Sequence, residues 1–234
     1  MVLKFSTAQF DAFAAPARAE WIAQAAQRLH QAYPEYFKTL DVEASALEPL
    51  CQAVEQWAAG YGVVGKRDVS QLCCVASTLG HKFWLDPRFG GYVNASMGNP
   101  DTPRGNAVGL LVNNASDWLD TLWRNDTFDR FVIRLDGYIR HDLEPNTQTL
   151  MDIVPGHWAL FDANTNERLM AWIRQKLPPT QSPAQRLVYV TCALVHGTGW
   201  VHDPQYGKIL RAIKAANTPV ELAASISAIY SEFR

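Results

Sequence analysis

The sequence has little excess charge and few cysteines, and both shortages exclude classes of protein. Its 21 Lys and Arg nearly balance its 23 Asp and Glu, which gives a formal net charge of −2. Without a basic excess or a run of Lys and Arg, we expect no nucleic-acid partner. The cysteines are Cys51, Cys73, Cys74 and Cys192, with no Cys-x-x-Cys pair. We therefore expect reduced thiols and a cytoplasmic location.

Targeting segments and long apolar runs are also lacking. Residues 1–6 show no charged segment followed by an apolar core, so no secretory signal is predicted. No apolar run approaches the roughly 18 residues of a membrane span, so we expect no membrane insertion. What remains is ordinary globular material: 234 residues, 48% hydrophobic and 11% aromatic. A chain of this length buries a sizeable core without disulfides.

Apolar residues recur at spacings of three and four along most of the chain, which is the helical period. Such stripes cover parts of residues 21–33, 46–59, 68–79, 128–143 and 186–196, and Gly or Pro stands near most of their ends. Residues 188–191 favour a strand by composition, but they lie inside a run with a strong helix start. The pattern therefore predicts an all-α protein.

An internal repeat divides the chain. Residues 197–207 match residues 80–90 at a shift of 117 positions, with glycines, an aromatic residue and Asp-Pro at equivalent places. Thr218-Pro219 follows Thr102-Pro103 at a shift of 116. Several matches in the same order predict a tandem duplication. We expect two copies of a multi-helix unit, residues 1–120 and 121–234, packed as one compact helical protein.

The repeated residues have a structural interpretation. An Asp followed by Pro is typical of a helix N-cap and first turn. A Gly after an apolar stripe is typical of a helix end in a left-handed conformation. We therefore interpret these positions as parts of the fold: Gly80, Asp86, Pro87, Gly197, Asp203 and Pro204.

Motifs that carry chemistry are absent or out of context. Residues 60–65, Gly-Tyr-Gly-Val-Val-Gly, match a dinucleotide fingerprint, but a predicted helix rather than a strand precedes them. Serine-hydrolase, zinc-protease and P-loop motifs are missing. We therefore predict no catalytic residues, no cofactor and no metal, and we do not expect an enzyme.

Histidines leave two alternatives open. His196, His202 and Asp203 are close in sequence, but Leu79 and Leu85 replace the two histidines in the first copy, which disfavours a metal site. A hydrolase with a dispersed site that uses His157, His196 or His202 with an Asp remains an alternative. So does a protein that binds a small molecule or a lipid between the copies.

Tryptophan is unusually abundant, with eight residues. Large rings most often fill a core, but Trp and Tyr are also enriched at interface hot spots. We predict that a partner contacts some of the following residues: Trp84, Phe89, Trp118, Trp123, Trp200 and Tyr206.

One set of short motifs resembles a known group. The set comprises the Trp21–Pro34 helix, Tyr61-Gly62, Asp68-Val69, Leu79-Gly80, Phe83 and Asp86-Pro87. Through them residues 10–115, and more weakly 126–234 as a second copy, resemble small all-helical accessory proteins of unassigned activity. Those proteins are encoded in bacterial type VI secretion clusters beside spike, PAAR and effector genes.

The resemblance implies a role but names no catalytic residues. It implies a non-enzymatic factor that binds another protein, namely a toxin, an effector or a spike component. An effector chaperone or adaptor is the first expectation. An immunity protein that neutralises a cognate toxin is the alternative.

Overall fold

A computed structural model describes residues 7–123, 127–176 and 182–233. Within these ranges every regular element is a helix, which confirms the all-α prediction. The first half comprises α1 (Thr7–Ala32), α2 (Pro34–Thr39), η1 (Ala44–Leu47), α3 (Glu48–Ala59), α4 (Lys66–Leu79), η2 (Phe83–Leu85), α5 (Gly90–Met97) and α6 (Arg104–Trp123).

The second half repeats much of this order. It comprises α7 (Phe128–Arg140), α8 (Thr147–Ile153), α9 (Pro155–Leu160), α10 (Ala163–Lys176), α11 (Pro183–His196), η3 (Trp200–His202), η4 (Pro204–Tyr206), α12 (Gly207–Ala215) and α13 (Pro219–Ser231). Helix α11 begins and ends 117 positions after α4, and η3 does the same relative to η2. The elements therefore correspond in order, whereas their origin by duplication stays a prediction. Helix α6 continues past residue 120, where the first copy was expected to end.

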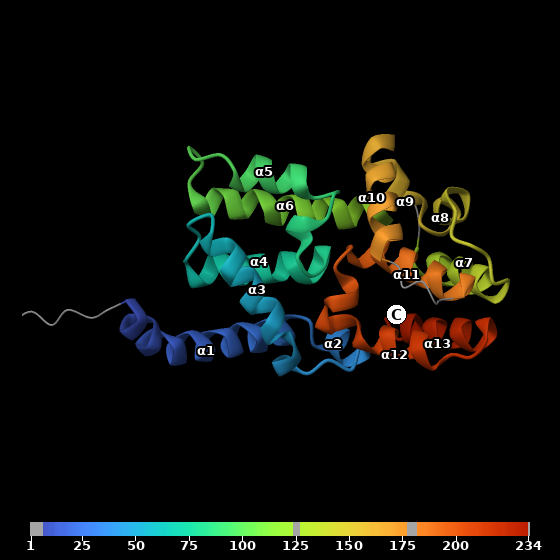
Figure 1. The fold of residues 1–234 in the computed structure, drawn as a ribbon, viewed down its shortest axis with the longest axis horizontal. Coiled ribbons are helices and arrows are strands. Elements are labelled where there is room, and N and C mark those ends of the chain that lie inside the picture. Colours follow the sequence, from blue (N-terminus) through green and yellow to red (C-terminus); the bar gives the residue numbers. More distant parts are fainter. Residues whose placement is uncertain (1–6, 124–126, 177–181, 234) are drawn as a thin grey trace, which may run out of the picture.

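The two halves place their last helices on opposite sides of the molecule. In the first half, α4 packs against α1, α3 and α6, and α5 covers α6 (Figure 1). In the second half, α13 packs against α7, α11 and α12. Helices α5 and α6 lie at the upper left of Figure 1, and α12 and α13 lie at the lower right. Between them, the ends of α4 and α11 meet at a corner.

Local signals explain most helix boundaries, with one exception at Asp86-Pro87. The Ser182 side chain accepts a hydrogen bond from the Gln185 amide and so caps α11. The β-prone residues 188–191 are helical because that cap and the burial of α11 outweigh strand propensity. Asp86-Pro87 was expected to start a helix, but these residues form a turn and α5 begins only at Gly90.

Candidate functional site

Two glycines form the corner where the halves meet. Gly80 ends α4 with φ +100° and ψ 158°, and Gly197 ends α11 with φ +90° and ψ 155°. A positive φ was predicted for both, although ψ places them in the region that glycine alone populates rather than in the left-handed helical region. A Cβ on Gly197 would lie 2.1 Å from the Leu79 carbonyl oxygen, and one on Gly80 would lie 2.2 Å from that of His196. The two helix ends therefore contact each other through backbone atoms, with no side chain between them.

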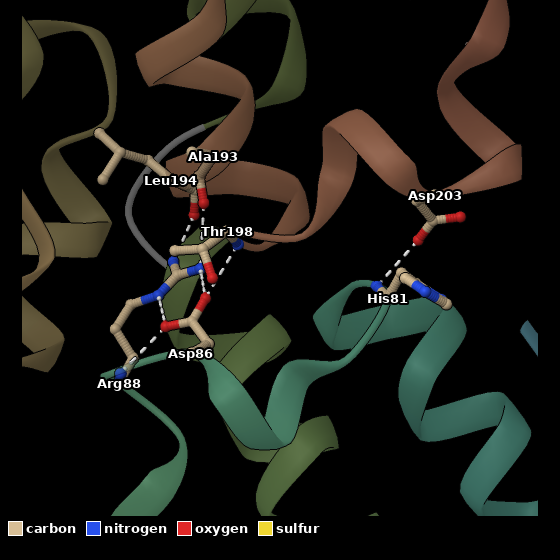
Figure 2. Close-up of polar contacts among 7 residues, drawn as sticks. All are labelled: His81, Asp86, Arg88, Ala193, Leu194, Thr198 and Asp203. Atoms are coloured by element: carbon tan, nitrogen blue, oxygen red, sulfur yellow. Dashed lines mark hydrogen bonds and ion pairs between the residues drawn. The ribbon is translucent and has the colours of Figure 1, made fainter. Parts of the chain in front are cut away.

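Two aspartates form reciprocal hydrogen bonds across the corner, each to the backbone of the other half (Figure 2). Asp86 accepts a hydrogen bond of 2.9 Å from the backbone N–H of Thr198, which follows Gly197. Asp203 accepts one of 2.9 Å from the backbone N–H of His81, which follows Gly80. Each half therefore supplies a carboxylate that fixes the turn of the other.

Asp86 has a cationic partner within the same turn. The Arg88 guanidinium donates to both carboxylate oxygens of Asp86, at 2.9 and 2.7 Å, and both side chains are buried. Arg88 also donates to the carbonyls of Leu194 and Ala193 in the last turn of α11, at 2.7 and 3.0 Å. Burial raises the pKa of Asp86, but the charge and hydrogen bonds of Arg88 outweigh burial and hold the pKa below its usual value.

Asp203 has a neutral partner at the equivalent place. Gln205, 117 positions after Arg88, donates its backbone N–H at 3.0 Å and its side-chain N–H at 3.2 Å to the Asp203 carboxylate. The Ser77 hydroxyl donates to the side-chain amide oxygen of Gln205 at 2.9 Å. Burial without a neighbouring cation raises the pKa of Asp203 to about 6. The corner therefore holds the halves together, and its polar groups form hydrogen bonds with one another.

Three of the six predicted partner-binding residues belong to the core, and partner contact at them stays a prediction. Phe89, Trp118 and Trp200 are 1%, 4% and 1% exposed. Phe89 packs edge-on against Trp118 at 5.5 Å between centroids, and Trp200 packs against Tyr189 at 5.1 Å. Neighbouring helices cover these rings in the free chain.

The other three residues lie elsewhere. Trp84 is partly buried and stacks on Trp57 with 4.6 Å between centroids. Trp123 and the largely buried Tyr206 line a groove between the halves. For these three residues, partner contact stays a prediction.

The structure does not bring the candidate histidines together as a metal site. His157 lies on α9, His196 on α11 and the exposed His202 in η3. Among the described residues, no three His, Cys, Asp or Glu side chains are grouped to hold a metal ion. Burial lowers the pKa of His196 to about 3, and burial together with the Arg88 charge lowers that of His157 to about 3. Both imidazoles are therefore neutral at pH 7.

These buried histidines predict acid sensitivity. In the unfolded chain a histidine has a pKa of about 6.5, whereas His157 and His196 in the fold have values of about 3, and burial lowers that of His81 to about 4. The unfolded state then binds more protons below pH 6.5, so the free energy of unfolding falls as pH falls. Asp203 acts in the opposite direction between pH 6 and 4, because its folded pKa is raised.

Three histidines outweigh one aspartate, so we expect a loss of about 3–5 kcal/mol between pH 6.5 and 4.5. Urea unfolding at a series of pH values measures it. His157→Phe keeps a ring between Trp158 and Phe161 and is expected to flatten the pH dependence. Stability that is constant or rises on acidification contradicts the assignment.

The groove runs from the corner along the first half. One part, of about 320 Å³, joins residues of both halves, and a second part, of about 310 Å³, lies between α4 and α6. Tyr33, Thr78 and Leu119 line both parts, so the two parts adjoin. The further lining residues are Tyr36, Gln71, Cys74, Val75, Ser77, Val112, Ala115, Ser116, Trp123, Phe128, Val195, His196 and Tyr206.

The groove is largely apolar. Among the lining residues that the structure describes, none is Asp, Glu, Lys or Arg, and the lining imidazole of His196 is neutral at pH 7. Tyr33 is 47% exposed and Leu119 is 36% exposed. At the floor, the Tyr36 and Tyr206 hydroxyls are 3.2 Å apart, and the His196 ring stacks on Tyr206 at 4.3 Å between centroids. The arrangement suits an apolar group that brings few hydrogen-bonding atoms.

Sequence reasoning missed most of this groove. Of its lining residues, only Trp123 and Tyr206 were predicted to bind a partner, and only His196 was considered for chemistry. Leu119 sits beside the buried Trp118 in an amphipathic helix, and nothing in the pattern separates a residue that lines a groove from one at the edge of the core.

Comparison with known proteins adds no relative. No protein family model, curated protein or solved structure matches the chain. Across the residues that the structure describes, helices long and apolar enough to cross a membrane are absent.

Proposed function

We propose that this chain is a non-enzymatic accessory factor that binds another protein, as an effector chaperone or adaptor of a bacterial secretion system. The largely apolar groove between the halves carries the proposal. Exposed apolar groups gathered in adjoining hollows are typical of interaction sites rather than of ordinary surface. The secretion system and the kind of partner come from the resemblance of residues 10–115 alone.

The histidines favour binding over catalysis. His157 is fully buried, with its ring packed among Trp158 and Phe161. His196 borders the groove, but its Nε2 pairs with the Tyr230 hydroxyl at 2.8 Å, and no Asp or Glu is among the described residues that line the groove. A general base is usually a titratable group held near its working pH, and the pKa of His196 is about 3.

Leu119→Glu tests the proposal because it places a carboxylate in the groove. The tagged full chain is purified from the bacterium that encodes it, and the co-purifying proteins are measured by mass spectrometry. We expect a stoichiometric effector, toxin or spike component with the wild type and at least a roughly tenfold loss with Leu119→Glu, since an unpaired buried charge costs well over 1.4 kcal/mol.

Leu110→Glu is the matched control. Leu110 lies on the same helix, is 48% exposed and does not line the groove, so its variant should keep the partner. Equal capture by all three proteins would contradict the proposal.

Loss of effector secretion on gene deletion would indicate the chaperone, and sensitivity to sibling cells would indicate the immunity protein.

A further inference from the structure

We infer that the hollow between the halves binds a small quaternary ammonium ion. This hollow, which we call the inter-half pocket, is the part of the groove of about 320 Å³ that Trp123, Phe128 and Tyr206 line. Its volume lies at the lower end of the range for small-ligand sites. The site goes beyond the proposed protein partner and does not occupy the part of the groove between α4 and α6.

Aromatic residues dominate the lining of the inter-half pocket. Five of its ten described lining residues are Phe, Tyr or Trp. They come from both halves of the chain, and the set is Tyr33, Tyr36, Trp123, Phe128 and Tyr206. Aromatic rings carry negative charge density on their faces, and groups of such rings are typical of sites that bind quaternary ammonium ions.

The described lining holds no positive charge that would repel a cation. It contains no Lys or Arg. Its one histidine, His196, is neutral at pH 7, because burial lowers its pKa to about 3. A cation in the pocket therefore contacts aromatic rings and neutral groups alone among the described residues.

A buried carboxylate lies behind the floor of the pocket. Asp203 accepts hydrogen bonds from Gln205 and from the His81 backbone, and among the described residues it has no ion-pair partner. The Gln205 side chain connects this carboxylate to the lining, because it donates to Asp203 at 3.2 Å and accepts from the Ser77 hydroxyl at 2.9 Å. Ser77 itself lines the pocket.

The negative charge of Asp203 acts on the lining residues. Burial raises the pKa of the Tyr36 and Tyr206 hydroxyls, and the charge of Asp203 raises both further. Because its own pKa is about 6, Asp203 is mostly ionised at pH 7. A cation in the pocket would therefore be attracted by a negative charge that no cation of the described chain compensates.

The polar groups of the lining favour a cation with methyl groups over one with N–H groups. The Tyr36 and Tyr206 hydroxyls lie 3.2 Å apart and pair with each other, and the Ser77 hydroxyl pairs with Gln205. No Asp or Glu is among the described lining residues. A primary ammonium would lose the hydration of its N–H groups without a carboxylate to replace it, whereas a trimethylammonium group has no N–H to satisfy.

Three small probes separate the effect of the charge from that of the methyl groups. They are choline, its neutral carbon analogue 3,3-dimethylbutan-1-ol, and ethanolamine, which keeps the charge but carries N–H groups. Isothermal titration calorimetry of the full chain at pH 7 measures each Kd. We expect choline to bind at least about tenfold more tightly than either of the others. Equal binding of choline and the neutral alcohol, or no binding of choline at millimolar concentrations, overturns the inference.

Tyr33→Leu tests the contribution of the rings, because Tyr33 is 47% exposed and leucine keeps the lining apolar. We expect its affinity for choline to fall about two- to fivefold. Tyr92→Leu is the matched control, since Tyr92 is 41% exposed and is not among the lining residues, and it should bind choline as the wild type does. Equal affinity of the two variants contradicts a site built from these rings.

Asp203→Asn tests the contribution of the buried charge. Asparagine keeps an oxygen that accepts from the His81 backbone N–H, and we expect the Kd for choline to rise about three- to fivefold. Circular dichroism shows whether the variant is folded, and an unchanged Kd in a folded variant contradicts the role of the carboxylate. If the variant does not fold, the comparison of choline with its neutral analogue decides.

The same trimethylammonium group occurs in free small molecules and in lipid headgroups. Co-sedimentation of the chain with phosphatidylcholine vesicles would indicate the headgroup as its source. Binding of choline without co-sedimentation would indicate a free small molecule. The Leu119-dependent capture of a protein is measured separately, so failure of choline binding leaves the proposed function standing.

Discussion

Gly197→Ala is expected to destabilise the protein by about 3–5 kcal/mol. A methyl group there meets the Leu79 carbonyl oxygen at 2.1 Å, and the residue holds φ +90°. Backbone strain of this kind costs about 1–3 kcal/mol, and overpacking adds a similar amount. Because the obstructing atom is backbone, α4 and α11 must separate to make room. Urea unfolding of the full chain, followed by circular dichroism, measures the change.

Gly109→Ala is the control for this prediction. Gly109 lies inside α6, and a Cβ there meets no atom within 4 Å. Alanine has the higher helix propensity, so this variant should gain about 0.5–1 kcal/mol. A cost below about 1 kcal/mol for Gly197→Ala would show that the corner is not a tight contact between the halves.

Asp86→Asn is expected to cost about 3–5 kcal/mol, because it leaves the Arg88 guanidinium buried without its carboxylate. Arg88 also binds the Leu194 carbonyl at the end of α11, so an unpaired Arg88 weakens the contact between the halves. Urea unfolding at pH 7 gives the free energy.

Two comparisons show whether the loss comes from the buried charge. Replacing Asp86 and Arg88 together by leucine should cost less than the sum of the single changes, because no unpaired charge remains. Asp41→Asn removes an exposed ion pair with Arg211, in which the Asp41 side chain is 78% exposed and the Arg211 side chain is 64% exposed. This change should cost less than about 1 kcal/mol. Similar losses for Asp86→Asn and Asp41→Asn would contradict the prediction.

The internal repeat shows how much of the corner could be predicted from the sequence. Matching residues 80–90 with 197–207 identified the corner residues and the positive φ of both glycines, because a turn that only glycine adopts leaves a local mark in sequence. It did not reveal that Asp86 and Asp203 bond across to the other half. Nor did it indicate that the two aspartates have opposite pKa shifts, because burial raises the pKa of Asp203 whereas the charge and hydrogen bonds of Arg88 lower that of Asp86.

The tryptophans show what could not be predicted from the sequence, namely which aromatic residues are core and which line the groove. Trp118 and Trp123 lie on one helix, yet one is core and the other lines the groove. Their abundance indicated that they pack against something, but not whether that was the protein itself or a partner. Only the arrangement of α4, α6 and α11 separates the two cases.

The sequence by itself determined the helices, most of their boundaries and the repeated glycine and aspartate positions, because caps, breakers and apolar spacing act over a few residues. Tertiary structure alone decided which stripes are covered. Helix α7 packs against α11 and α13, whereas residues of α4, of α6 and of the end of α11 line the groove. An apolar stripe has the same sequence pattern in both situations, since burial depends on which helix packs against it.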